Sequence, residues 1–280
     1  MSRGRFETAD GCVIDYVDEG DGMPVLWQHG LGATQAQAAE VFPESPLFRR
    51  ITLECRGHAG SELGAPEALS IRQFAQDAIG LLDHLGVKRA VVGGISLGGA
   101  IALLLSIYFP GRVSALIIAR PAWLDEHAPE RLQIYRDVAE LLEQSGPGQG
   151  LARLQASARY RLLAAESADN AASLRSFFQR ANPASTVALL GRIPAQGLGA
   201  TREQMARLAL PTLVIANQGD YVHSIEMAKA VTALIPGADL KLIPSKNAPR
   251  NGYVEAFRAA LHEFLSRIQG EFHARTDAQG

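Results

Sequence analysis

The sequence predicts an α/β protein with a mostly parallel sheet flanked by helices and interrupted by a helical insertion. Three observations predict this class. Short apolar runs recur along the chain, each too short for a helix but suited to a buried strand. Segments between them carry apolar residues at three- and four-residue steps, the period of one helix face. The long stretch 121–205 has helical composition and no convincing strand, so we expect it to lie over one end of the sheet.

The individual elements follow from these patterns in order. An Asp10-Gly11 turn between β-prone residues predicts an antiparallel hairpin over residues 6–20. Buried strands are predicted at 24–27, 50–53, 89–93, 115–118, 211–215 and 239–243. Helices are predicted at 71–85, 99–108 and 254–268. We therefore expect a core formed by residues 1–120 and 206–270, a helical lid at 121–205, and a flexible tail at 271–280.

Composition narrows the function. Hydrophobic residues make up 47% of the 280 and charged ones 20%, which is typical of a globular protein and not of a disordered one. The net charge of −2 provides no basic field for nucleic acid or anionic lipid. We expect a small-molecule substrate and neither a nucleic-acid nor a membrane partner, and a homodimer is compatible with the sequence.

Cofactor and location are predicted from other features of the chain. Cys12 and Cys55 are isolated, without the spacing of a metal cage or disulfide framework, so we expect no metal and no organic cofactor. The first residues lack an apolar run of signal-peptide length, which predicts a cytoplasmic protein.

The motif that carries chemistry is Gly94-Ile95-Ser96-Leu97-Gly98, which follows a predicted strand and precedes a predicted helix. This setting gives a G-x-S-x-G pattern its meaning, because glycine neighbours permit a tight, strained turn that exposes the serine hydroxyl. The backbone N–H of Leu97, at the start of the helix, can stabilise an oxyanion. The alternative is a glycine-rich connection with an incidental serine. We predict that Ser96 is a nucleophile.

This tight turn between strand and helix, residues 94–98, is called the elbow below. With the elbow, the chain resembles the α/β-hydrolase superfamily, in particular its esterases and enol-lactone hydrolases, over nearly its whole length. The segment 29–32, His-Gly-Leu-Gly, resembles the HGxG segment of that family. The resemblance implies that the amide of Leu31 is a second oxyanion donor. It also places Gly30 at the substrate. The segment 120–123, Arg-Pro-Ala-Trp, stands at the junction of strand and lid, where the family often places pocket residues, so we expect it to contact the substrate. Within it, Trp123 is either a substrate contact or a core aromatic.

A third segment, 54–61, resembles the family's D-x-R-G-H-G-x-S loop, with Glu54 and Ala59 departing from it. In the family this loop organises the surroundings of the pocket. The resemblance therefore implies structural roles for Arg56 and His58, with a catalytic role for His58 as the alternative.

The resemblance implies a catalytic triad of serine, histidine base and acid. Its acid is expected after the seventh strand, where Asp220 stands, and the resemblance implies that Asp220 orients the base. The alternative is an aspartate that caps the helix beginning near Ser224.

Arginines of the lid could meet a substrate carboxylate. These are Arg153, Arg159, Arg161, Arg175, Arg180 and Arg192.

The general base is missing from its family position. In the family, the histidine base precedes two apolar anchors of the closing helix by about ten and about seventeen residues. Counting back by these spacings from Phe257 and Phe264 gives Asn247 in both cases, and asparagine cannot accept the serine proton. Three explanations stay open. Asn247 replaces a native histidine by design; or His223, three residues after Asp220, is the base; or the chain has lost hydrolysis and binds a small molecule. We predict a serine hydrolase that cleaves an ester or lactone of a small molecule, with the silent binding protein as the alternative.

Overall fold

The protein, described by a computed structural model over residues 2–247 and 252–277, is built on a twisted sheet of eight strands in the order β1-β2-β4-β3-β5-β6-β7-β8. The hairpin strands β1 and β2 are antiparallel to each other, β2 is antiparallel to β4, and all other neighbours are parallel. The strand bounds are β1 Ser2–Glu7, β2 Val13–Glu19, β3 Met23–Gln28, β4 Phe48–Leu53, β5 Ala90–Ile95, β6 Val113–Ala119, β7 Thr212–Asn217 and β8 Asp239–Ile243.

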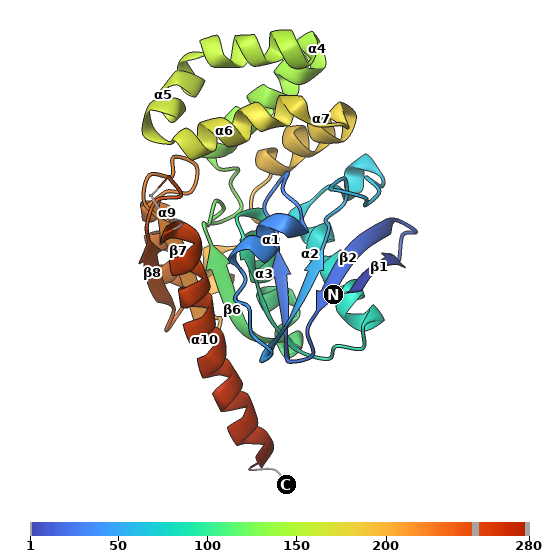
Figure 1. Ribbon diagram of the computed structural model, residues 1–280, viewed down its shortest axis with the longest axis vertical. Coiled ribbons are helices and arrows are strands. Elements are labelled where there is room, and N and C mark those ends of the chain that lie inside the picture. Colours follow the sequence, from blue (N-terminus) through green and yellow to red (C-terminus); the bar gives the residue numbers. More distant parts are fainter. Residues whose placement is uncertain (1, 248–251, 278–280) are drawn as a thin grey trace.

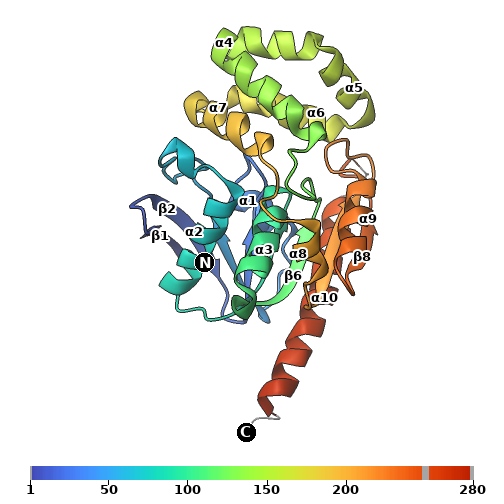
Figure 2. The same ribbon diagram turned by 180° about the vertical axis from the view of Figure 1, so that it is seen from behind.

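Helices cover both faces of this sheet. The helices α1 and α10 cover the face turned toward the viewer in Figure 1, and α2, α3 and α9 cover the opposite face (Figure 2). Their bounds are α1 Gln35–Val41, α2 Ile71–His84, α3 Leu97–Tyr108, α9 Ile225–Leu234 and α10 Gly252–Asp277. The fold class predicted from the sequence is confirmed.

Alternation of side chains along the central strand explains why two apolar cores form. In β5, Val92 packs into the core under α2 and α3, whereas its neighbour Val91 packs into the core under α1 and α10. Successive strand residues point to opposite faces, so a strand covered on both sides must be apolar throughout. All six residues of β5 are buried, which matches its unbroken apolar run.

The helix α2 illustrates how local sequence sets an element. The Ser70 side chain accepts a hydrogen bond from the amide of Gln73, which caps the first turn. The buried residues then recur on one face of the helix and reach the sheet. They are Ile71, Phe74, Ala75, Asp77, Ala78, Leu81 and Leu82.

The sequence did not predict two features of the helices. The short helix α1 begins after Thr34, whose side chain accepts a hydrogen bond from the amide of Ala36. The closing helix α10 continues to Asp277, through most of the expected tail, and projects beyond the core (Figure 1). No proline interrupts it, and a single interior glycine, Gly270, costs only about 1 kcal/mol. Residues 278–280 of the expected tail lie outside the described residues.

Between β6 and β7 the chain forms the helical insertion of residues 121–205, most of which lies above the carboxyl ends of the parallel strands (Figure 1). Its first helix bends at Gly146, whose φ of 67° is outside the helical region, and Pro147 follows. The helices above the strand ends are α4 Gln133–Ala156, α5 Ala158–Glu166, α6 Ala168–Ser176 and α7 Pro183–Arg192. A further helix, α8 Arg202–Ala206, lies next to α9 beside the sheet (Figure 2). Short 3-10 turns occupy Pro66–Ala68, Pro110–Arg112, Glu130–Leu132, Phe177–Gln179 and Ile193–Ala195. Among the described residues, no helix has an apolar stretch sufficient to cross a bilayer.

Candidate active site

Ser96 sits in a strained turn between β5 and α3, with φ 55° and ψ −109°. Glycine is required on both sides of this turn because the backbone of Gln28 passes close by. A Cβ at Gly94 would lie 2.6 Å from the Gln28 carbonyl oxygen, and one at Gly98 would lie 2.4 Å from it. Any side chain at these positions would overlap backbone. The elbow thus holds the Ser96 hydroxyl at the carboxyl ends of the parallel strands.

The Ser96 hydroxyl has a histidine partner. His223 Nε2 lies 2.8 Å from Ser96 Oγ, and His223 Nδ1 lies 3.0 Å from each carboxylate oxygen of Asp220. Both residues stand on the loop between β7 and α9, and the His223 amide also donates to Asp220 at 3.0 Å. Ser224 itself caps α9 by accepting a hydrogen bond from the Met227 amide, so Asp220 is not the cap.

The charges around this pair favour a neutral imidazole beside an ionised carboxylate. Burial alone would raise the pKa of Asp220, but the neighbouring His223 and Arg120 outweigh it and hold that pKa well below its ordinary value. Burial lowers the pKa of His223, although Asp220 opposes the shift. A neutral imidazole with Nδ1–H directed to Asp220 leaves Nε2 free to accept the serine proton.

Arg120 belongs to the segment 120–123 that was expected to contact the substrate, and it also braces the carboxylate of Asp220, a contact that the sequence did not predict. Its Nε donates to Asp220 at 2.7 Å, and its Nη2 lies 3.4 Å from Asp169. The backbone of Arg120 has a φ of 51°, and its amide donates to the carbonyl of Ile215 at 2.7 Å. The sequence feature that could have pointed to this contact is a charged residue directly after the apolar strand β6, at the end of the sheet where the site lies.

The amides predicted as oxyanion donors lie close to Ser96. A Cβ on Gly30 would come within 3.7 Å of the Ser96 Cβ, so the loop carrying Leu31 approaches the elbow closely. The amides on either side of Leu31 are engaged, that of Gly30 by Gln37 at 2.8 Å and that of Gly32 by His58 at 2.8 Å. Among the described residues, none accepts a hydrogen bond from the amide of Leu31 or of Leu97.

Ser96 and His223 open into a cavity of about 60 Å³. The predicted substrate contacts Gly30 and Trp123 both line it, and Trp123 is also buried, donating from Nε1 to the Gln196 carbonyl at 3.0 Å. None of the six lid arginines lines this cavity. Its lining comprises Gly30, Leu31, Gln37, Ile95, Ser96, Arg120, Trp123, Leu132, Tyr135, Asp169, Asn170, Ser173, His223 and Lys246.

Asn247 lies outside this arrangement. It is exposed, it does not line the cavity, and its amide donates to the Ser245 hydroxyl at 3.3 Å. Its neighbour Lys246 does reach the cavity. The structure therefore brings Ser96, His223 and Asp220 together and leaves Asn247, although predicted among the catalytic positions, apart from them.

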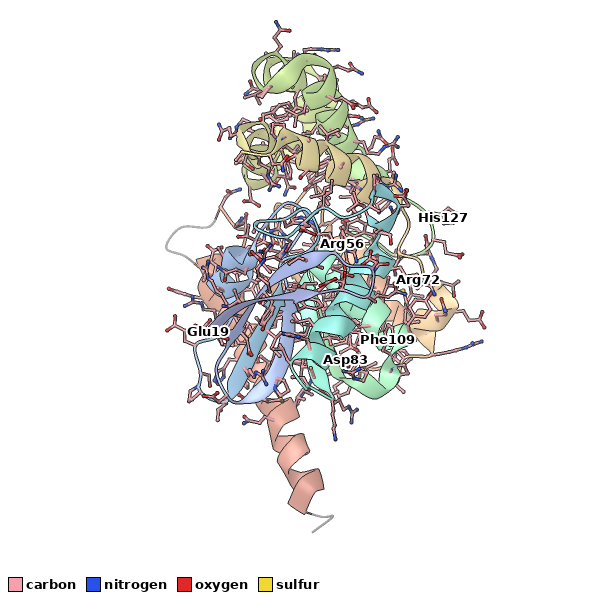
Figure 3. All side chains as sticks on the ribbon, turned by 90° about the vertical axis from the view of Figure 1, so that its right-hand side faces the viewer. Glu19, Arg56, Arg72, Asp83, Phe109 and His127 are labelled. Carbon is pink, nitrogen blue, oxygen red and sulfur yellow. The ribbon has the colours of Figure 1, made fainter. Side chains whose placement is uncertain are left out.

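Arg56 and His58 occupy structural positions. The Arg56 side chain is fully buried and forms paired hydrogen bonds at 2.7 Å with Asp77 and with Asp10, inside the core beside the N-terminal hairpin (Figure 3). Burial lowers the pKa of His58 to about 3, so it is neutral and accepts from the Gly32 amide. The described part of the chain contains no group of His, Cys, Asp or Glu suited to a metal ion.

The strained serine, its histidine partner and the parallel sheet define an α/β protein with a serine exposed on a tight strand-to-helix turn. A family model described as the alpha/beta hydrolase fold matches residues 23–247, and the chain belongs to this family.

Several relatives are named as hydrolases. The chain is 26% identical over 257 residues to 3-oxoadipate enol-lactonase 1 of Acinetobacter baylyi, covering 87% of this chain and 85% of that protein. It is 30% identical over 191 residues to the putative carbamate hydrolase RutD of Pseudomonas savastanoi pv. phaseolicola, covering 66% and 72%. A thermophilic esterase structure from Thermogutta terrifontis is 26% identical with a TM-score of 0.73, covering 96% of this chain and 100% of the other.

Proposed function

We propose that this protein is a serine hydrolase that cleaves an ester or lactone bond of a small molecule through an acyl-enzyme on Ser96. The observation that carries the proposal is the 2.8 Å contact between His223 Nε2 and Ser96 Oγ, with Nδ1 of the same ring on Asp220. This chain of contacts supplies what a serine hydroxyl needs at neutral pH, namely a proton acceptor held in the correct tautomer. The names of the relatives support hydrolysis of small molecules.

Acylation follows from these positions. Neutral His223 takes the Ser96 proton at Nε2 while Oγ bonds to the substrate carbonyl carbon, and the carbonyl oxygen becomes an oxyanion. The amides of Leu31 and Leu97 donate to that oxyanion. When the C–O bond to the leaving group breaks, His223 returns its proton to the departing oxygen. For a lactone the leaving oxygen stays attached to the acyl group.

Deacylation repeats these steps with water. His223 accepts a proton from water as the water oxygen bonds to the acyl carbon, and the same two amides hold the second oxyanion. The bond from carbonyl carbon to Ser96 Oγ then breaks, Oγ regains the proton, and a carboxylic acid is released. Asp220 stabilises the imidazolium in both halves and does not itself take up a proton. The helical insertion acts as a lid that limits bulk water.

A fluorophosphonate probe tests the nucleophile. After incubation, intact-mass and peptide measurements should find one adduct on Ser96, and the Ser96→Ala variant should gain none. A chain whose serine stays unmodified would instead fit the silent binding protein. The probe reports on the serine directly, so its result does not depend on guessing the substrate.

Paired variants test the base. Hydrolysis of p-nitrophenyl acetate should fall by about 10³-fold or more in His223→Ala, because general-base assistance is removed from the nucleophile. Asn247→Ala is the matched control and should retain turnover, since position 247 lies apart from the nucleophile. The proposal for His223 fails if Asn247→His raises turnover by orders of magnitude while His223→Ala changes nothing.

A further inference from the structure

Three charged side chains share the cavity with Ser96, and they come from separate parts of the fold. Arg120 follows β6, Lys246 follows β8, and Asp169 stands in the first turn of α6 in the helical insertion. Asp169 lies between the two cations. Its Oδ1 is 3.0 Å from Lys246 Nζ, and its Oδ2 is 3.4 Å from Arg120 Nη2.

Arg120 holds its two carboxylate partners unequally. Its contact to Asp220 at 2.7 Å is a short, charge-assisted hydrogen bond, whereas 3.4 Å to Asp169 is well beyond the usual 2.7–2.9 Å. A guanidinium has five N–H donors, so a second carboxylate can bind it more closely than Asp169 does. The side chain is only 7% exposed, which makes an anionic partner valuable. Asp169 is therefore a loosely held counter-ion.

The small volume of the cavity indicates that its lining adjusts when a substrate enters. A volume of about 60 Å³ is well below the roughly 300 Å³ or more that small-molecule pockets commonly measure. Arg120 and Lys246 belong to the core, and Asp169 belongs to the insertion. Turning the Asp169 side chain away from the cations therefore withdraws the negative charge and leaves both cations in place, and it does not require α6 to give up the hydrogen bond from the Val222 amide to Asn170.

From these contacts we propose that Arg120 and Lys246 form a subsite for a carboxylate of the substrate, which Asp169 occupies in the free enzyme. The proposal rests on the hydrolase function proposed above and names its substrate class, an ester or lactone that also carries a carboxylate. With Asp169 withdrawn, the two cations outnumber the remaining carboxylate, Asp220, by one charge. A carboxylate on the substrate restores neutrality and takes the donors that Asp169 releases.

Two matched esters test the subsite. The p-nitrophenyl monoester of glutaric acid carries a free carboxylate, and its methyl ester has nearly the same shape without the charge. The wild-type kcat/KM should favour the charged ester by about tenfold at low ionic strength, the effect of one charge-assisted hydrogen bond. A ratio of one or below contradicts the subsite, whatever the absolute rates are.

Variants assign the preference to individual residues. Lys246→Gln should lower the charged-to-neutral ratio by about tenfold. Asp169→Asn should raise it, because the internal competitor is neutralised. Lys241→Gln is the matched control: Lys241 lies on β8, is exposed, and pairs with Glu263 at 3.4 Å, away from the cavity. If Lys241→Gln changes the ratio as much as Lys246→Gln does, the effect is one of general surface charge and the subsite is refuted.

A binding measurement separates failure of the subsite from failure of the hydrolase function. In Ser96→Ala, isothermal titration should detect monomethyl glutarate, and Lys246→Gln in the same background should weaken it about tenfold. If the esters are not cleaved and the fluorophosphonate probe leaves Ser96 unmodified, the hydrolase function fails while titration still decides on the subsite. If both esters are cleaved, and monomethyl glutarate gives the same titration curve in Ser96→Ala with and without Lys246→Gln, the subsite is overturned and the hydrolase function stands.

Discussion

Replacing Asp77 by asparagine should destabilise the fold strongly because it leaves Arg56 buried beside a neutral amide. Asp77 accepts two hydrogen bonds from Arg56 at 2.7 Å, and its side chain is only 1% exposed. The amide nitrogen of asparagine would face a guanidinium N–H, so at least one of these hydrogen bonds is lost. Asp10 still pairs with Arg56, but its side chain is 46% exposed and compensates less well.

The magnitude follows from burial. Removing one partner of a buried ion pair costs about 3–5 kcal/mol, and because the Asp10 contact remains we expect a cost of about 3 kcal/mol for Asp77→Asn. For a protein of this size each kcal/mol lowers the melting temperature by about 2–4 °C, so we expect a fall of about 6–12 °C. Asp10→Asn removes the more exposed carboxylate and should cost about 1 kcal/mol or less.

Equilibrium unfolding in urea, followed by tryptophan fluorescence and checked by calorimetry, measures both variants. Arg56→Met combined with Asp77→Leu should recover most of the lost stability, because no charge then stays buried without a partner. Equal free-energy losses in Asp77→Asn and Asp10→Asn would refute the reasoning, since burial would then have no influence on the cost of losing a partner.

Three further predictions concern pH and the elbow. Burial lowers the pKa of His29 to about 4 and of His58 to about 3, so both stay neutral when folded while the unfolded chain takes up protons below about pH 6.5. Stability is therefore lost as pH falls, by about 2 kcal/mol per histidine between pH 7 and pH 5 in urea unfolding, with a smaller loss in His58→Asn. The acid limb of kcat/KM should lie below the ordinary histidine pKa because that of His223 is lowered, and Arg120→Met should move it upward; an unmoved limb contradicts this. Gly98→Ala should abolish probe labelling or soluble expression, because its Cβ would lie 2.4 Å from backbone, and normal labelling would argue against a tight elbow.

Most of the architecture could be predicted because it depends on local patterns. The fully buried strand β5 is a continuous apolar run, and a parallel strand covered on both faces permits little else. The helix α1 was not predicted because its seven residues are too short for a clear period, and its signal was only the cap at Thr34. The length of α10 depends on the absence of a stop signal, which sequence patterns define poorly.

The candidate site could be predicted only where one segment carries the information. Ser96 lies in a motif whose glycines are required by the nearby Gln28 backbone, so its position could be predicted from the sequence. For the general base, spacing from the closing helix indicated Asn247, and His223 was one of three open explanations because it follows Asp220 by three residues. The contact of His223 with Ser96 was not predictable in itself, because it depends on the meeting of two distant loops. The contact of Arg120 with Asp220 escaped prediction for the same reason, since the two residues lie far apart along the chain.

Under the proposed mechanism the acid Asp220 and the base His223 stand on one loop, which changes what the neighbouring loops can do. The loop between β7 and α9 is held at Val222, whose amide donates to Asn170 of α6 at 3.0 Å. That second loop contributes Lys246 to the cavity instead of a proton acceptor. Under the proposed mechanism, substitutions at His223 should therefore reduce kcat for every ester. Substitutions at Lys246 should act mainly through recognition, because that ammonium has no contact with Ser96 or His223 among the described hydrogen bonds.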